Sequence, residues 1–118
     1  MNHIEVGKRG EELAKKYIRG KGYKIIEQNW HTKYGEIDLV AENKEWCVLI
    51  EVRTKIGEQF GLPEETLNYR KMQRLMRNAN AYAAIRRISK PYRIDAVCIV
   101  LDESGNLIRI DHYENITG

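Results

Sequence analysis

Two carboxylates and two cations stand close together in the sequence, in segments with the pattern of β-strands. Asp38 lies in an alternating segment, residues 35–42, and Glu51 directly follows the apolar run C-V-L-I. Arg53 and Lys55 come two and four residues after Glu51, and such positions share one face of a strand. If the two strands are neighbours in a sheet, Asp38 and Glu51 meet beside two cations.

This combination of side chains suits the hydrolysis of a phosphodiester. Two carboxylates can hold Mg²⁺, with Mn²⁺ as a substitute, and a metal-bound water can attack phosphorus. A nearby cation can bind the phosphate or stabilise the charge that develops on its oxygens. Glu51 should lie near the core, where an unpaired carboxylate is costly, so we expect it to have a partner or a metal. Glu36 shares a face with Asp38 and is a secondary candidate ligand. The simpler alternative is that all these residues are solvated charges at strand ends.

The elements that must position these residues follow from the periodicity of the chain. Helices are predicted at residues 6–20 and 64–87, and strands at residues 23–30, 35–42, 46–55, 92–101 and 107–114. The apolar stripe of the second helix consists of Met72, Leu75, Met76, Ala79 and Ala83. The first three strands are expected to form a meander, and the second helix to cross over and place the fourth strand in the same sheet. The pattern therefore predicts an α/β fold, with a mixed central sheet of about five strands flanked by helices.

Five stretches of the chain, taken in order, resemble a known family. They are G-K-R-G-E-E-L-A-K-K-Y-I-R-G-K-G-Y-K-I-I, N-W-H-T-K-Y-G-E-I-D-L-V-A, V-L-I-E-V-R-T-K, F-G-L-P-E-E-T-L-N-Y-R-K and Y-R-I-D-A-V. The sequence resembles the uncharacterised YraN-type family of small bacterial proteins. That family is similar to the PD-(D/E)XK, or restriction-endonuclease-like, superfamily, which includes archaeal Holliday-junction resolvases. The resemblance covers nearly the whole chain. It implies an αβββαβ core and a Mg²⁺-dependent endonuclease-like activity on DNA, with branched or damaged forms as expected substrates.

The resemblance also implies a role for each matching residue. Asp38 and Glu51 correspond to the metal-binding aspartate and the second acidic ligand, and Glu11 to the helix glutamate that completes the metal site in resolvase-like members. Arg53 stands where the superfamily usually has lysine. Arginine does not lose its proton, so we do not expect it to act as a general base, although it can bind a phosphate through two hydrogen bonds. Lys55, on the same face, is the alternative, and the sequence leaves this choice open.

A run of positive charge in the second predicted helix indicates a surface for nucleic acid. The stretch between Thr66 and Ile94 contains no acidic residue. Its basic residues are Arg70, Lys71, Arg74, Arg77, Arg86, Arg87, Lys90 and Arg93. Arg70, Arg74 and Arg77 share one helix face. Together with Lys71 they are the residues predicted to bind nucleic-acid phosphates. The resemblance favours DNA over RNA, and the residues themselves leave that choice open. The alternative is a solvated helix face.

The composition fits one folded domain spanning residues 1–118, with 31% charged and 42% hydrophobic residues. The net charge of +3 is too small to indicate a nucleic-acid partner by itself. Cys47 and Cys98 each lie in an apolar run, and we expect two reduced core thiols. The chain has neither a secretory signal nor an apolar stretch of about 20 residues, so we expect a cytoplasmic protein with no membrane partner.

Two other functions remain open beside a nuclease. One is a catalytically inactive nucleic-acid-binding module of the same fold, which the arginine at position 53 favours. The other is an interaction domain whose basic helix binds an acidic protein. Resolvase-like relatives act as dimers, but the sequence shows no interface signature, so a homodimer also stays open. The three histidines, His3, His31 and His112, are scattered and lack the spacing of metal ligands.

Overall fold

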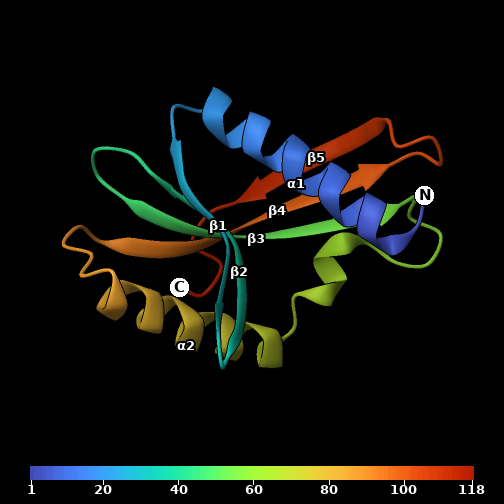
Figure 1. The fold of residues 1–118 in the computed structure, drawn as a ribbon. Coiled ribbons are helices and arrows are strands. Elements are labelled where there is room, and N and C mark those ends of the chain that lie inside the picture. The colour runs from blue at the N-terminus through green and yellow to red at the C-terminus, as the bar shows by residue number, and fades with distance from the viewer.

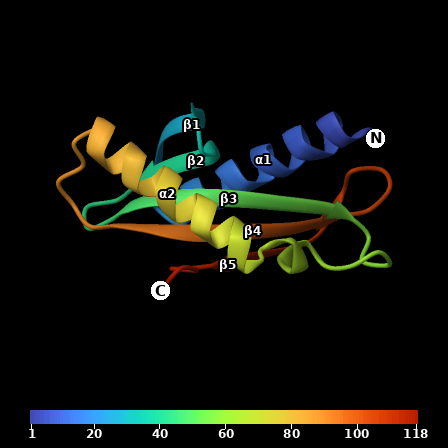
Figure 2. The same cartoon turned by 90° about the horizontal axis from the view of Figure 1, so that it is seen from below.

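The computed structural model describes residues 1–118 and contains one mixed five-stranded sheet with a helix on each face (Figures 1 and 2). The elements are α1 (His3–Gly20), β1 (Lys24–Thr32), β2 (Gly35–Glu42), β3 (Cys47–Ile56), the 3-10 helix η1 (Pro63–Thr66), α2 (Tyr69–Ile85), β4 (Tyr92–Leu101) and β5 (Leu107–Tyr113). The strand order is β1-β2-β3-β4-β5, and only β3 and β4 are parallel. The predicted α/β class, meander and helical crossover are therefore confirmed.

The core consists of two apolar clusters, one on each face of the sheet. Strand β3 supplies Val48 and Ile50 to the cluster under α1, and Cys47 and Leu49 to the cluster under α2. This is the arrangement expected of an unbroken apolar run in a central strand. Both cysteines are buried and free, and burial raises the pKa of the Cys47 thiol to about 11. Neither helix combines the length and the hydropathy that crossing a membrane requires.

The start of the second helix was predicted wrongly. Residues 64–66 belong to η1, and α2 begins only at Tyr69. The reason is a local cap: the side chain of Asn68 accepts a hydrogen bond from the backbone N–H of Lys71 at 2.9 Å, which starts a new helix there. The apolar stripe also differs, because Met76 is 40% exposed while Tyr82 is buried. Helix α2 is thus shorter than predicted and slightly rotated.

Helix α1 lies unusually close to β3 at Gly10. A Cβ atom at Gly10 would lie 1.9 Å from Thr54 Oγ1, so only glycine permits this approach. The helix starts at His3, earlier than predicted, where the Asn2 side chain caps it by accepting from the Glu5 N–H. The contact sets the first half of α1 against the charged end of β3.

Candidate active site

Asp38 lies where β2 separates from β3. The antiparallel pairing of these strands extends only from Glu42 to Leu39. At the next position the Asp38 carboxylate replaces a backbone partner, because its Oδ2 accepts a hydrogen bond from the Val52 N–H at 2.8 Å. The separation opens a cleft of about 340 Å³. Its lining consists of Asp38, residues 52–55 of β3, His3, Val6, Gly7 and Glu11 of α1, and Pro63 and Thr66 of η1.

Glu51 is buried on β3 and faces two cations. Only 6% of its side chain is exposed, and its Oε2 lies 3.0 Å from Lys71 Nζ and 3.6 Å from Arg53 Nη2. Neither contact has hydrogen-bond geometry, so this buried oxygen has no hydrogen-bond partner. The Nε of Arg53 is likewise buried without an acceptor. Glu51 Oε2 is thus ion-paired but not hydrogen-bonded, and buried polar atoms without hydrogen-bond partners call for an explanation, of which a ligand site is one.

The two carboxyl groups influence each other strongly. Burial, followed by the neighbouring Glu51 carboxyl, raises the pKa of Asp38 to about 9, and the hydrogen bond from Val52 opposes this shift. Two adjacent buried carboxylates cannot both ionise cheaply without a cation. At neutral pH Asp38 therefore holds a proton, even though Lys71 and Arg53 lie beside Glu51. A divalent ion with oxygen ligands relieves that repulsion, so the Asp38–Glu51 pair fits Mg²⁺.

Glu11 shares the cleft but is turned toward another partner. Its Oε1 accepts a hydrogen bond from Asn29 Nδ2 at 3.0 Å. The structure gathers no group of three or more His, Cys, Asp and Glu side chains at metal-binding distance. The secondary candidate Glu36 lies outside the cleft and within 3.7 Å of His31 Nε2. Glu11 as the third ligand stays a prediction, and the donor set that the structure assembles is the Asp38–Glu51 pair.

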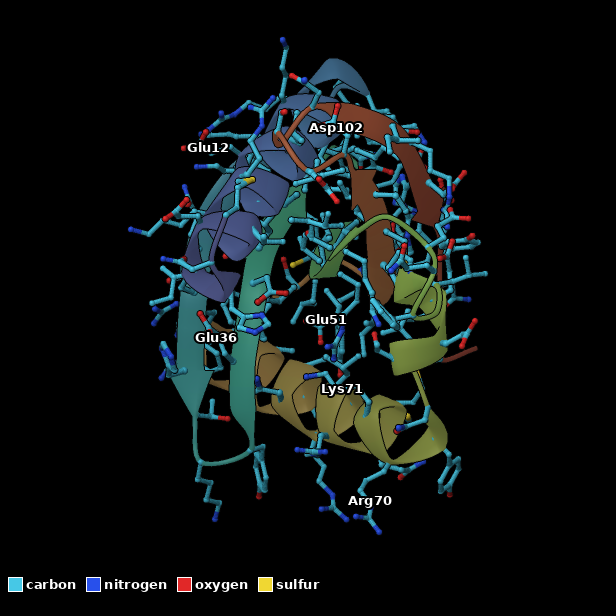
Figure 3. All side chains as sticks on the ribbon, turned by 90° about the vertical axis from the view of Figure 1, so that its right-hand side faces the viewer. Glu12, Glu36, Glu51, Arg70, Lys71 and Asp102 are labelled. Carbon is cyan, nitrogen blue, oxygen red and sulfur yellow. The ribbon has the colours of Figure 1, made fainter.

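The lysine that contacts Glu51 comes from α2. Lys55 lines the cleft, but its Nζ lies 3.5 Å from the carbonyl oxygen of Phe60. Figure 3 shows Lys71 directed from α2 toward Glu51, whereas Arg70 points away from the sheet. Lys71 therefore lies apart from the exposed arginines with which the sequence grouped it.

Half of the positive charge counted along the second helix is matched in space. Lys71 lies against Glu51, Arg86 against Glu27, Lys90 against Glu42 and Arg93 against Asp95. The positive charge of these four residues is therefore balanced by acidic residues of the strands, which a count along the helix segment does not include. Arg70, Arg74, Arg77 and Arg87 are exposed and form no ion pair. Three of these four, Arg70, Arg74 and Arg77, lie on the outer face of α2, and Arg87 follows its end.

The sequence from residue 10 to residue 99 matches the model of an uncharacterised protein family, UPF0102. The chain belongs to this family. It is 41% identical over 115 residues to the UPF0102 protein of Thermodesulfovibrio yellowstonii, covering 98% of this chain and 97% of that one. A UPF0102 protein of Syntrophomonas wolfei is 41% identical over 112 residues, covering 94% and 96% of the two chains. One from Porphyromonas gingivalis is 35% identical over 114 residues, covering 97% and 84%. The resemblance to the YraN-type family is confirmed.

The span matched by the family model contains every candidate site residue and ends before β5. It includes the Asp38–Glu51 pair, both basic residues that follow in β3, and the basic face of α2. The names of the relatives state no activity.

Sequence reasoning missed a buried polar cluster between β4 and β5. Asp95 is fully buried and accepts hydrogen bonds from Arg93, from His112 Nε2 at 2.8 Å and from the Asn115 N–H at 2.9 Å. Burial opposes ionisation, but the hydrogen bonds from His112 and Arg93 hold the pKa of Asp95 below its ordinary value. The only signal was an Arg-x-Asp spacing within an apolar strand. The cluster lies outside the cleft and joins the last strand to the sheet.

Arg109 fixes the wall of the cleft formed by η1. Its guanidinium contacts Glu58, Glu64 and Asp111, and the Tyr113 hydroxyl donates to Glu64 at 2.6 Å. The hydrogen bonds from Arg109 are the main reason that the pKa of Glu64 falls to about 2. Glu64 belongs to η1, and η1 supplies Pro63 to the cleft.

We expect Arg109→Gln to raise the pKa of Glu64 from about 2 toward its ordinary value of 4.5, with the Tyr113 hydrogen bond retaining part of the shift. A depressed carboxyl pKa stabilises the fold above the unfolded-state value, and that stability is lost as the pH falls toward 2. The free energy of unfolding of the natural protein should thus exceed that of the variant by about 0.5–1 kcal/mol above about pH 5. The difference is small because both side chains are partly exposed, and it should close below that pH. Urea denaturation between pH 2.5 and 6 measures the gap. A gap that widens toward low pH would contradict the assignment.

Proposed function

We propose that this protein is a Mg²⁺-dependent nuclease that binds DNA on the exposed face of α2 and hydrolyses phosphodiesters at the Asp38–Glu51 pair. The observation that supports it best is the pair itself. Two neighbouring carboxyl groups face each other, one with a pKa raised to about 9 and the other with a buried oxygen that lacks a hydrogen-bond donor. Lys71 and Arg53 contact only Glu51, and a divalent cation held by both carboxylates would relieve the repulsion between them.

The residues of the chain would divide the work as follows. Asp38 and Glu51 would hold the metal, with Glu11 on the cleft wall as a third acid, and the metal would supply an activated water and stabilise phosphoryl charge. The Val52 N–H orients the Asp38 carboxylate. Arg53 keeps its charge at any relevant pH, and its unpaired Nε can donate to a phosphate oxygen.

The outer face of α2 supports a nucleic-acid substrate. Arg70, Arg74 and Arg77 are exposed, lie within about two helical turns and have no acidic partner. Such a row neutralises phosphates without reading the bases, and its binding depends strongly on salt. We propose DNA as the substrate, in branched or damaged form, in line with the resemblance to resolvases.

A nucleic-acid-binding module without cleavage is the second candidate. Arg53 favours it, because an arginine at this position cannot act as a general base. The two candidates share the binding surface and differ only in turnover.

A cleavage panel separates them. Single-stranded, duplex, flapped and four-way DNA are incubated with Mg²⁺ or Mn²⁺, with the natural protein and with Glu51→Gln. We expect metal-dependent cleavage of at least one substrate and a loss of about 10³-fold in the variant, since a metal ligand is removed. Binding without cleavage in either metal would favour the inactive module. Equal cleavage by both proteins would contradict a role for Glu51.

A further inference from the structure

The residue that contacts the buried carboxylate most closely is a lysine from a different element than the sequence suggests. We propose that Lys71 is the functional lysine of this site. Its amine pairs with Glu51 until a divalent cation displaces it, and the released amine then binds the substrate phosphate. This inference rests on the proposed function and deepens it.

The geometry singles out Lys71 among the basic residues near the site. Its Nζ lies 3.0 Å from Glu51 Oε2, closer than the 3.6 Å of Arg53 Nη2, while Lys55 is turned toward the carbonyl of Phe60. Its side chain is 26% exposed and that of Glu51 only 6% exposed. The amine therefore reaches from a half-open position onto a buried oxygen (Figure 3).

The start of α2 fixes where Lys71 stands. The Asn68 side chain accepts from the Lys71 N–H at 2.9 Å, which places Lys71 in the first helical turn, and Leu75 and Ala79 pack the helix against the sheet. The side chain that begins at this anchored backbone has a flexible four-carbon stem. It can turn between two partners without any movement of the helix.

The chemistry of Glu51 explains why the lysine must leave. An ammonium ion at 3.0 Å and a Mg²⁺ ion bound at about 2.0–2.1 Å would compete for the same carboxylate oxygen. A cation that takes Glu51 frees the amine within the site. Lysine is a compact charge on a flexible stem, so the displaced amine can bind a phosphate oxygen.

Metal titration without nucleic acid tests the competition. Mn²⁺ binding is measured by calorimetry for the natural protein and for Lys71→Met, Lys71→Arg and Lys90→Met. Lys90→Met is the matched control, since it removes the same charge and an equivalent contact, 3.1 Å from Glu42, away from the cleft. We expect Lys71→Met to bind Mn²⁺ about tenfold more tightly, and Lys71→Arg and Lys90→Met to match the natural protein. Unchanged or weaker binding by Lys71→Met would overturn the proposal.

Turnover gives the second readout. Lys71→Met should lower kcat by about 100-fold, while the dissociation constant for the DNA substrate changes less than about threefold. A larger dissociation constant with unchanged kcat would overturn the proposal and mean that Lys71 only contributes to DNA binding. If the natural protein cuts no substrate but the Mn²⁺ shift occurs, the nuclease fails while the competition for Glu51 holds. If it cuts and Lys71→Met cuts equally well, the nuclease stands and this inference fails.

Discussion

Asp38→Asn should yield a protein that is inactive and yet more stable than the natural one. Asparagine keeps an oxygen that can accept from the Val52 N–H, but it removes the charge that the site must suppress. Cleavage should fall by about 10³-fold, because a metal ligand loses its charge. Without divalent metal, the free energy of unfolding at pH 8 should rise by about 1–2 kcal/mol, as is common when a strained functional group is relieved.

The gain in stability should depend on pH in a defined direction. The pKa of Asp38 is about 9 in the fold against an ordinary value of 3.8, so between these limits the folded state binds a proton that the unfolded state lacks. Stability of the natural protein therefore falls as the pH rises through this window. The advantage of Asp38→Asn should be absent near pH 4 and grow toward pH 9. Urea denaturation in the presence of a chelator follows it.

Addition of Mg²⁺ and a surface control variant distinguish relief of the carboxylate pair from a general change in stability. Mg²⁺ should stabilise the natural protein in proportion to its binding and leave Asp38→Asn unaffected. Glu45→Gln removes an exposed carboxylate in the turn after β2 and should change neither stability nor cleavage. A destabilised Asp38→Asn, or one that still responds to Mg²⁺, would refute the paired-carboxylate site.

Removal of the unmatched arginines should weaken DNA binding and flatten its salt dependence. In the triple variant Arg70→Gln, Arg74→Gln, Arg77→Gln, each lost phosphate contact reduces the slope of log affinity against log salt by about 0.9. The slope should thus fall by about 2.7 in total, and affinity at low salt by about 100-fold. Fluorescence anisotropy of labelled DNA between about 50 and 200 mM salt measures both quantities.

A variant with the same change in net charge provides the control. Lys8→Gln, Lys16→Gln, Arg19→Gln alters exposed residues of α1, which covers the other face of the sheet from α2. It should retain nearly full affinity and slope. Equal losses in both triple variants would mean that net charge, and not the face of α2, governs binding.

The strands were predicted well because their patterns are local. Clean alternation and flanking turns delimit β2, and Pro91 precedes β4, so both strands have the predicted bounds. The start of α2 was missed because Glu64 and Glu65 are good helix formers that follow a proline, while the cap at Asn68 depends on one side-chain hydrogen bond. Helix propensity summed over a window of residues cannot detect a new helix start that depends on a single cap.

The site was only partly predictable, for a related reason. Asp38 and Glu51 lie side by side because adjacent strands of a meander bring neighbouring segments together. The contact of Lys71 with Glu51 depends on how α2 packs across the sheet, and the partners of Arg86 and Lys90 come from β1 and β2. Charge counted along a chain cannot register acids that the fold supplies from elsewhere.

Strand β3 remains an edge strand until β4 has been synthesised. The two strands pair in parallel along their whole length, from Cys47 with Tyr92 to Ile56 with Leu101, and α2 lies between them in the chain. A nascent chain that carries both carboxylates but stops short of Tyr92 lacks the neighbour that holds Glu51 in place. Since parallel pairing forms only after its crossover is complete, Glu51 reaches its final position beside Asp38 only once β4 has been made. A product truncated before Tyr92 would therefore lack the assembled carboxylate pair.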